Sequence, residues 1–367
     1  MKILLINQYG PGSGAPTGRL LGELASFLEE NGHQVSWLAT DPLYGAPKPG
    51  WRRWRHELRA HVVLLLRGLS HPAVDAVISF TSPVCLVVTA RMIACFHRAK
   101  SWHWAMDLYP DLAVALREIK PGLLEALLHR LMKMAYHSTG GVVALDEDMR
   151  GYLEKVYSVK ADVIPPWPES AIETELSLAD SRPPGPRWQW MYSGNLGRAH
   201  EWEILALAQS ELEKRGLPVW LVVQGGGASL ELLKNKAREL GLKQCEFRGY
   251  AAPGDLLQSL LSSRVLIATQ RPETTGLLWP SKLSLLLDLP RPLVWIGNGK
   301  SAAALALRQR PDTGVFDPHE TLKLVDWLDK LYHQTNSTHR QQCSAPGVRQ
   351  NSKALWLKLI ESDRASV

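Results

Sequence analysis

The chain has 367 residues, of which 45% are hydrophobic and 21% are charged, and its formal net charge is +6. This length exceeds what one hydrophobic core usually organises, so we expect two folded domains and little disorder. The four cysteines lie far apart without a C-x-x-C pair, which argues against a disulfide framework or a cysteine zinc site and favours a cytoplasmic protein. No window holds the roughly 20 uninterrupted apolar residues of a membrane-spanning helix.

Strand-like and helix-like segments alternate through the first half. The predicted strands are KILLINQY, QVSWLAT, VDAVISF, a strand within SWHWAMDLYPD, GGVVALD and ADVIPP, and residues 17–31 and 123–136 are predicted helices. This alternation is typical of a parallel sheet covered by helices on both faces.

The alternation stops at Pro165 and starts again after the densest proline cluster, DSRPPGPR. We therefore predict an N-terminal domain over residues 1–166, a linker over 167–187 and a C-terminal domain over 188–350. The closing segment, residues 351–367, is a predicted helix that packs back across a domain. The fold class is α/β, with two tandem Rossmann-like, doubly wound domains whose strand ends face one cleft.

Residues 51–67 combine five arginines with two tryptophans and a Val/Leu run. Such a basic amphipathic helix fits peripheral contact with an anionic membrane. The alternative, which we slightly favour, is a surface helix that packs its Leu/Val face on the sheet and leaves its arginines in water. Nucleic-acid binding is not expected, because no other basic-aromatic cluster accompanies this segment.

Each half has a glycine-rich loop after its first strand. In the first, GPGSGAPTGR, Gly12 and Gly14 allow a ligand to approach the backbone, and the next helix N-terminus offers N–H groups to an anion. Alone, this loop is equally consistent with a tight strand-to-helix turn.

The second loop, YSGNLGRAHE, adds charge to glycine. Gly194 and Gly197 flank Asn195, and Arg198 can hold a diphosphate through paired donors. His200 either adds a second donor or cation or is a capping or surface histidine.

A third segment, RPETTGLLWPSKL, carries Glu273 and Lys282, with Pro280 and Ser281 as helix-starting and capping residues. A lysine in a first helical turn opposes the helix dipole, so we favour a phosphate-binding role for Lys282 over a structural one.

Acidic residues also follow a strand in the first half. Asp107 and Asp111, with His103 nearby, could accept hydrogen bonds from sugar hydroxyls or take a proton from an acceptor. Asp111 could instead simply cap the next helix.

These segments together resemble the family-4 group of retaining glycosyltransferases with the GT-B fold. The likeness rests on the opening strand and glycine loop, DLYPD, VVALDEDMRGYL, VIPP, YSGNLGRAHE and PSKL. Among its members, transferases of colanic acid and O-antigen assembly that handle fucose-type sugars are the most similar.

The resemblance implies a UDP- or GDP-sugar donor bound mainly by the C-terminal domain and a saccharide or polyprenyl-diphosphate-linked acceptor bound by the N-terminal one. Transfer would proceed with retention and without a metal or other cofactor, at the cytoplasmic face of the membrane. Arg198 and Lys282 become phosphate contacts, and Glu273 faces the donor sugar. His200 lies near a lysine of many members, and Tyr250 is assigned to donor binding.

One position departs from the resemblance. Many members carry a second glutamate, directed at the ribose, on the helix after Lys282, where this chain has Leu285. Two alternatives to a transferase therefore stay open: a GT-B binding subunit that has lost turnover, and a sugar-nucleotide epimerase.

Overall fold

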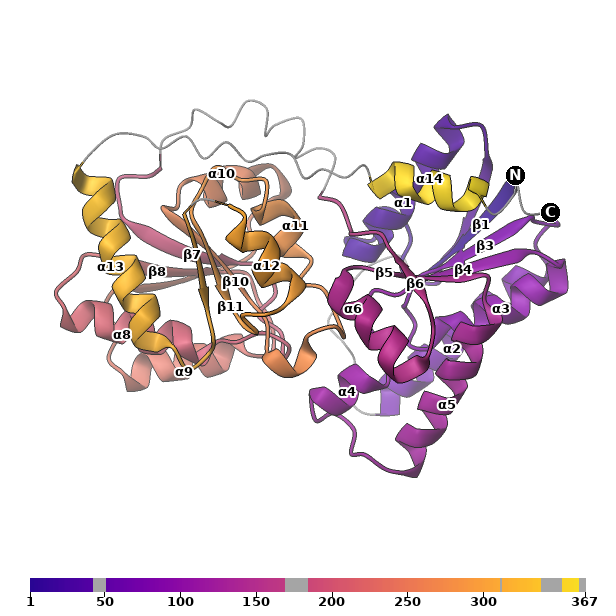
Figure 1. Cartoon of the computed structure of the whole chain (residues 1–367), viewed down its shortest axis with the longest axis horizontal. Coiled ribbons are helices and arrows are strands. Elements are labelled where there is room, and N and C mark those ends of the chain that lie inside the picture. Colours follow the sequence, from indigo (N-terminus) through magenta and orange to yellow (C-terminus); the bar gives the residue numbers. More distant parts are fainter. Residues whose placement is uncertain (42–50, 169–183, 311, 338–351, 363–367) are drawn as a thin grey trace. The chain divides into compact units, whose positions relative to one another are not determined.

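The computed structural model describes residues 1–41, 51–168, 184–310, 312–337 and 352–362. Most of the predicted linker lies outside these ranges. The chain forms two compact units, each built on a six-stranded parallel sheet (Figure 1). Among the described residues, no helix has both the length and the apolar character needed to cross a bilayer.

The first sheet has the strand order β2-β1-β3-β4-β5-β6. Its strands are short runs of apolar residues, as expected for strands buried on both faces. They are β1 (Lys2–Ile6), β2 (Gln34–Leu38), β3 (Ala76–Ser79), β4 (Lys100–Trp104), β5 (Gly141–Ala144) and β6 (Ala161–Val163).

Helices cover both faces of this sheet, as predicted. They are α1 (Pro16–Glu30), α2 (Trp51–Leu69), α3 (Leu86–His97), α4 (Asp111–Ala115), α5 (Leu123–Ser138), α6 (Glu147–Tyr152) continued by the turn Leu153–Tyr157, and α14 (Ser352–Ser362). The connections through α2, α3 and α5 all lead the chain the same way across the sheet, so right-handed crossovers place these helices on one face. Figure 1 shows α1 and α14 on the other face.

The second sheet has the order β12-β11-β10-β7-β8-β9. Its strands are β7 (Gln189–Ser193), β8 (Trp220–Gln224), β9 (Cys245–Arg248), β10 (Val265–Thr269), β11 (Leu293–Ile296) and β12 (Thr313–Phe316). Its helices are α8 (Glu203–Lys214), α9 (Leu230–Glu239), α10 (Leu256–Leu261), α11 (Lys282–Leu286), α12 (Ala302–Arg308) and α13 (Thr321–Ser337), with short turns at Pro253–Asp255 and Pro272–Thr274. The pattern in the sequence predicted this series only as far as β11, and the structure adds α12, β12 and α13.

Two later segments of the chain belong to the first unit, which comprises residues 1–167, 276–279 and 349–367. Within it, Leu277 is buried in the core, and its carbonyl accepts a hydrogen bond from the Leu108 amide at 2.8 Å. In α14, the buried Trp356 ring lies edge-on to Trp104, 5.3 Å between centroids. The predicted closing helix therefore packs on the N-terminal domain.

Helix α2 differs from the interpretation that we favoured. Its buried residues are Ala60, Leu64 and Gly68, and Leu64 packs with residues of β1 and β3, while Leu58, Val62 and Leu66 are exposed. The expected burial of its Leu/Val face is therefore wrong for these three residues, because the helix carries two apolar stripes and the sheet takes only one.

Candidate functional site

The second sheet has a point where the chain reverses its direction of strand addition. The chain adds β8 and β9 on one side of β7 and then returns to place β10 on the other side. A reversal of this kind is where ligands commonly bind in open α/β sheets, beyond the carboxyl ends of the strands. Here the loops after β7 and β10 are tied together, because the Arg271 amide donates to the Ala199 carbonyl at 2.8 Å.

Glycines bring the backbones at this point into close contact. Gly194 has a φ of +119° and follows β7 directly. After β8, a Cβ on Gly225 would lie 2.2 Å from the Gly194 carbonyl oxygen, and one on Gly227 would lie 2.5 Å from backbone atoms of Leu196. The loop thus requires glycine at 225 and 227, two positions that the sequence reasoning passed over although QGGG is a visible signal.

Lys282 reaches across this bend from the first position of α11. Its Nζ lies 3.7 Å from the centroid of the Tyr192 ring, donates to Tyr192 Oη and lies 3.4 Å from the Asn195 carbonyl oxygen. Tyr192 Oη in turn donates to that carbonyl at 2.9 Å. A Cβ on Gly194 would lie 3.5 Å from Lys282 Cε, so the lysine covers the glycine.

Burial shifts the pKa values of Lys282 and Tyr192. Desolvation lowers the pKa of Lys282 well below its ordinary value and raises the pKa of Tyr192 well above its own. The lysine therefore carries less positive charge in the free protein than an exposed lysine does, and an arriving anion would restore its charge.

His200 is held on the same side of the loop. Its Nδ1 lies 2.6 Å from the Thr269 carbonyl oxygen, at the end of β10. Burial, and next the charge of Lys282, lower the pKa of His200 to about 3, so the ring is neutral at physiological pH. Because a carbonyl only accepts, Nδ1 carries the proton and Nε2 is an acceptor. His200 would therefore meet a ligand as a neutral ring whose Nε2 accepts a hydrogen bond, rather than as the second cation that we predicted.

Other predicted donor-site residues lie on the loops around this group. Asn195 and Arg198 are exposed on the loop after β7, and Gly197 is half-buried between them. Glu273 is exposed in the turn after β10, and its charge is one of the smaller causes, after burial, of a raised pKa at Glu201.

Two further predicted residues flank the loops. Ser281 occupies the cap position before α11, but its side chain accepts no hydrogen bond from the helix, so the predicted side-chain cap is wrong. Tyr250 follows β9 and is 66% exposed. A Cβ on Gly226 would lie 3.0 Å from its ring, which indicates that the ring packs against that backbone.

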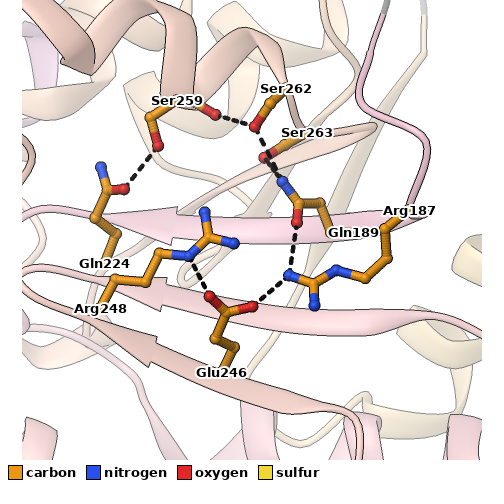
Figure 2. Close-up of polar contacts among 8 residues, drawn as sticks. All are labelled: Arg187, Gln189, Gln224, Glu246, Arg248, Ser259, Ser262 and Ser263. Atoms are coloured by element: carbon orange, nitrogen blue, oxygen red, sulfur yellow. Dashed lines mark hydrogen bonds and ion pairs between the residues drawn. The ribbon is translucent and has the colours of Figure 1, made fainter.

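A polar network fixes the strands behind these loops (Figure 2). Gln224, the last residue of β8, donates to Ser193 Oγ at 3.2 Å and accepts from Ser259 Oγ of α10 at 2.6 Å. Nearby, Glu246 accepts hydrogen bonds from Arg248 and Arg187, and these bonds lower its pKa to about 2.

The same network runs on to the start of β7. Arg187 donates to Gln189 Oε1 at 3.2 Å, and Gln189 donates to Ser262 and Ser263. It therefore connects β7, β8, β9 and α10, so we assign it a structural role.

The first sheet reverses direction between β1 and β3. Gly12 and Gly14 lie in the loop after β1, each with a φ of +79° that favours glycine. A Cβ on Gly18, in the first turn of α1, would lie 2.3 Å from the Gly10 carbonyl oxygen, so this loop also folds tightly onto its helix. The Gln8 amide donates to the Ser82 carbonyl at 2.6 Å and joins the two strand ends.

Asp107 follows β4 at the same edge of the first sheet. Burial raises the pKa of its carboxyl group to about 6, and its backbone forms an antiparallel bridge with Leu278. The preceding amide, that of Met106, donates to Thr81 Oγ1 at 2.7 Å, which fixes the turn. A carboxyl group that titrates near neutral pH is suited to proton transfer.

The two neighbours that we grouped with Asp107 have other roles. His103 lies inside β4, is buried in the core and contacts Ser79 Oγ at 2.9 Å, and burial lowers its pKa to about 3. Asp111 caps no helix: it is the first residue of α4 and accepts hydrogen bonds from Tyr152, at 3.0 Å, and Tyr157.

No protein-family model and no curated protein sequence matches this chain. Solved structures do match it. Sucrose-phosphate synthase from Thermosynechococcus elongatus aligns over 100% of both chains at 13% identity, with a TM-score of 0.67. The lipopolysaccharide outer core galactosyltransferase WaaB covers 99% of this chain and 100% of its own at 15% identity and a TM-score of 0.64. Anabaena HepE in complex with UDP covers 100% of both at 14% identity and 0.61.

The chain has the GT-B fold. In this GT-B protein the first unit is the N-terminal Rossmann-like domain and the second unit is the C-terminal one. Lys282, Gly194, Asn195 and His200 come together in the C-terminal domain, while Gly12, Gly14 and Asp107 lie in the N-terminal domain.

Proposed function

We propose that this protein transfers a hexosyl group from a UDP- or GDP-sugar to a saccharide or polyprenyl-diphosphate-linked acceptor, with retention and without a metal. The observation that carries the proposal is the Lys282 amine seated over Gly194 and Tyr192 at the reversal point of the second sheet. A lysine amine beside a glycine bend, with a pKa that an arriving anion would raise, is suited to a phosphate group that must approach the backbone closely.

In this proposal the leaving diphosphate is the centre of catalysis. Lys282, with Arg198 on the loop after β7, would stabilise the negative charge that develops as the sugar bond breaks. The leaving diphosphate would then help to remove the acceptor proton on the same face of the sugar. Asp107, with its pKa near 6, would bind acceptor hydroxyls or share in that proton transfer.

The remaining residues would position the donor. His200 Nε2 would accept a hydrogen bond from a donor hydroxyl, Glu273 would contact the sugar, and the exposed Tyr250 ring would lie beside the nucleotide. Asn195, Gly197 and Ser281 would line the phosphate path in the C-terminal domain. Gly12 and Gly14 would let a phosphate or an acceptor approach the backbone of the N-terminal domain. HepE was solved with UDP, which supports a uridine nucleotide as the first ligand to test.

The test is calorimetric titration with UDP and GDP, followed by transfer and hydrolysis assays over a panel of their sugars. We expect micromolar binding of one diphosphate and release of it from one sugar nucleotide. Absence of binding to every member of the panel would overturn the proposal.

Leu285 favours a second candidate, a GT-B binding subunit without turnover. This residue occupies α11, one turn after Lys282, where the resemblance places a glutamate for the ribose. Nucleotide binding without transfer by the natural chain, together with transfer by Leu285→Glu, would support this candidate over the enzyme.

A lipid-linked acceptor would place the protein at the cytoplasmic face of the membrane in surface polysaccharide synthesis. WaaB, a lipopolysaccharide galactosyltransferase, is consistent with such a pathway. Residues 51–67, whose tryptophans are exposed, are the proposed peripheral contact.

A further inference from the structure

Exposed large hydrophobic side chains gather on one layer of the N-terminal domain. Of the eighteen such side chains among the described residues, twelve lie on α2, α3 and α5. They are Trp51, Trp54, Leu58, Val62 and Leu66 on α2, Met92 and Phe96 on α3, and Leu123, Leu124, Leu127, Leu131 and Met134 on α5. Helix α3 contacts both of its neighbours, so the three helices form one continuous layer. An apolar surface of this extent indicates an interaction site.

Helix α5 shows how this surface is built. Its buried residues Met132, Ala135 and Tyr136 define the inner side. Leu123, Leu127, Arg130, Met134 and His137 recur every three or four residues and therefore point the opposite way. Leu127 is 64% and Met134 is 63% exposed, so the outer side carries apolar and basic residues together.

An open hollow of about 540 Å³ lies on this outer side. It is lined by Arg130, Lys133, Met134, His137 and Ser138. Lys133 Nζ lies 3.4 Å from Ser158 Oγ, and His137 Nε2 lies 3.0 Å from the Tyr157 carbonyl, so two of the basic side chains are positioned. Arg130 and Lys133 supply cationic N–H donors next to the exposed Leu127 and Leu131, a combination that fits a phosphate attached to hydrocarbon chains.

Charge along the layer favours the same partner. Arg52, Arg55 and Arg59 are exposed on α2, and Arg55 lies over the Trp51 ring at 5.0 Å. The acidic residue of α2, Glu57, turns inward and accepts a hydrogen bond from the Val84 amide at 3.0 Å. Tryptophan and arginine beside leucine are typical of helices that lie in the headgroup region of an anionic bilayer.

We propose that α2, α3 and α5 dock on an anionic bilayer and that the α5 hollow holds the phosphate headgroup of one of its lipids. The acyl chains of that lipid contact Leu127, Leu131 and Met134, and the tryptophans of α2 enter the interface. This proposal extends the membrane contact of residues 51–67 to a three-helix surface with a specific headgroup site. It does not depend on the donor site, so the two proposals fail separately.

The test is co-sedimentation of the full chain with vesicles of phosphatidylcholine, alone or mixed with phosphatidylglycerol. We expect binding to the mixed vesicles only. The double substitution Arg130→Gln with Lys133→Gln should weaken it about thirtyfold, since each basic residue near an anionic surface contributes about 1 kcal/mol. The matched control is Lys243→Gln with Lys330→Gln, two exposed lysines of the C-terminal domain, which should bind as the natural chain does.

Further experiments distinguish a bilayer from a free phosphate compound and from a second copy of this chain as the partner of the surface. Leu127→Ser with Met134→Ser should also weaken vesicle binding, whereas glycerol phosphate at constant ionic strength should not release the protein from vesicles. Three results would each overturn the proposal. The first is equal vesicle binding by the natural chain and the Arg130/Lys133 variant, and the second is release of the protein from vesicles by glycerol phosphate. The third is a dimer in sedimentation velocity that the Leu127/Met134 variant no longer forms. Far-UV circular dichroism and thermal denaturation of every variant report folding independently of the vesicles and of the donor site.

Discussion

Substitution of Lys282 by glutamine tests the donor site most directly. Glutamine keeps one N–H donor and most of the length of the side chain but removes the charge and the contact of the amine with the Tyr192 ring. A hydrogen bond to a charged group contributes about 1.5–3 kcal/mol, so the dissociation constant for UDP or GDP should rise about ten- to hundredfold. Isothermal titration calorimetry measures this, with Lys330→Gln on α13 as the control. A change smaller than about twofold would refute the assignment of Lys282 to the phosphates.

The lowered pKa of Lys282 also predicts that the protein takes up protons when it binds a nucleotide. Burial holds the pKa of Lys282 well below its ordinary value in the free protein, and a bound diphosphate raises it again. Binding should therefore take up protons at pH values between the two pKa values, and affinity should increase as the pH falls through that window. The apparent binding enthalpy would then depend on the ionisation enthalpy of the buffer, and Lys282→Gln would lose this dependence. A natural chain without any buffer dependence would show that Lys282 is already charged.

Three further predictions follow from the geometry. Gly225→Ala should destabilise the C-terminal domain by about 3 kcal/mol and abolish UDP binding. The new Cβ would clash with the Gly194 carbonyl oxygen, and residue 225 has a φ of +127° that favours glycine. Normal stability in chemical denaturation together with normal affinity in calorimetry would contradict this. Because the pKa of Asp107 is about 6, transfer should fall as the pH drops below 6, and Asp107→Asn should lower the rate at neutral pH and remove that limb of the pH profile. His200, neutral above about pH 3, should give no titration step in donor binding between pH 5 and 8, so a step near pH 6.5 that His200→Gln removes would show that our assignment of a neutral ring is wrong.

Some residues of the proposed donor site could be grouped from the sequence because their signals are local. Gly194 and Gly197 mark a tight loop after a strand, and Lys282 follows a proline that starts a helix, so sequence order alone identifies them. The alternation of strands and helices predicted both Rossmann-like domains for the same reason. Short-range spacing, however, does not state which distant groups these residues meet.

The missed features depend on long-range packing. Tyr192 looks like one more buried strand residue, and only the return of β10 and α11 places Lys282 over its ring. The protonation of His200 depends on burial against the Thr269 carbonyl, 69 residues away. His103 was grouped with the site because it is close to Asp107 in sequence, although its position within β4 directs it into the core.

Helix α2 illustrates a different kind of ambiguity. A period of 3.6 residues shows that apolar stripes exist but does not say which of two stripes faces the sheet. The stripe with the small residues Ala60 and Gly68 allows the helix to approach α3 and the strands closely, and a Cβ on Gly68 would lie 2.4 Å from Ile93. The stripe with Leu58 and Val62 is exposed to solvent. We therefore interpret the outer surface of α2 as an interaction site and not as a simple solvated surface.

The proposed donor site combines a fixed backbone with an adjustable charge. Contacts of Gly225 and Gly227 with the loop after β7, and the hydrogen bond from Arg271 to Ala199, hold the loops without a ligand. Within this frame Lys282 is desolvated, so it regains its full charge only when an anion supplies enough negative potential to reverse the lowering of its pKa. A diphosphate provides two such charges and a chloride ion one. The site should therefore discriminate by charge density as well as by shape, and the lowered pKa of Lys282 reduces the free-energy cost of burying an ammonium group whose hydrogen-bond partners, Tyr192 and the Asn195 carbonyl, are uncharged.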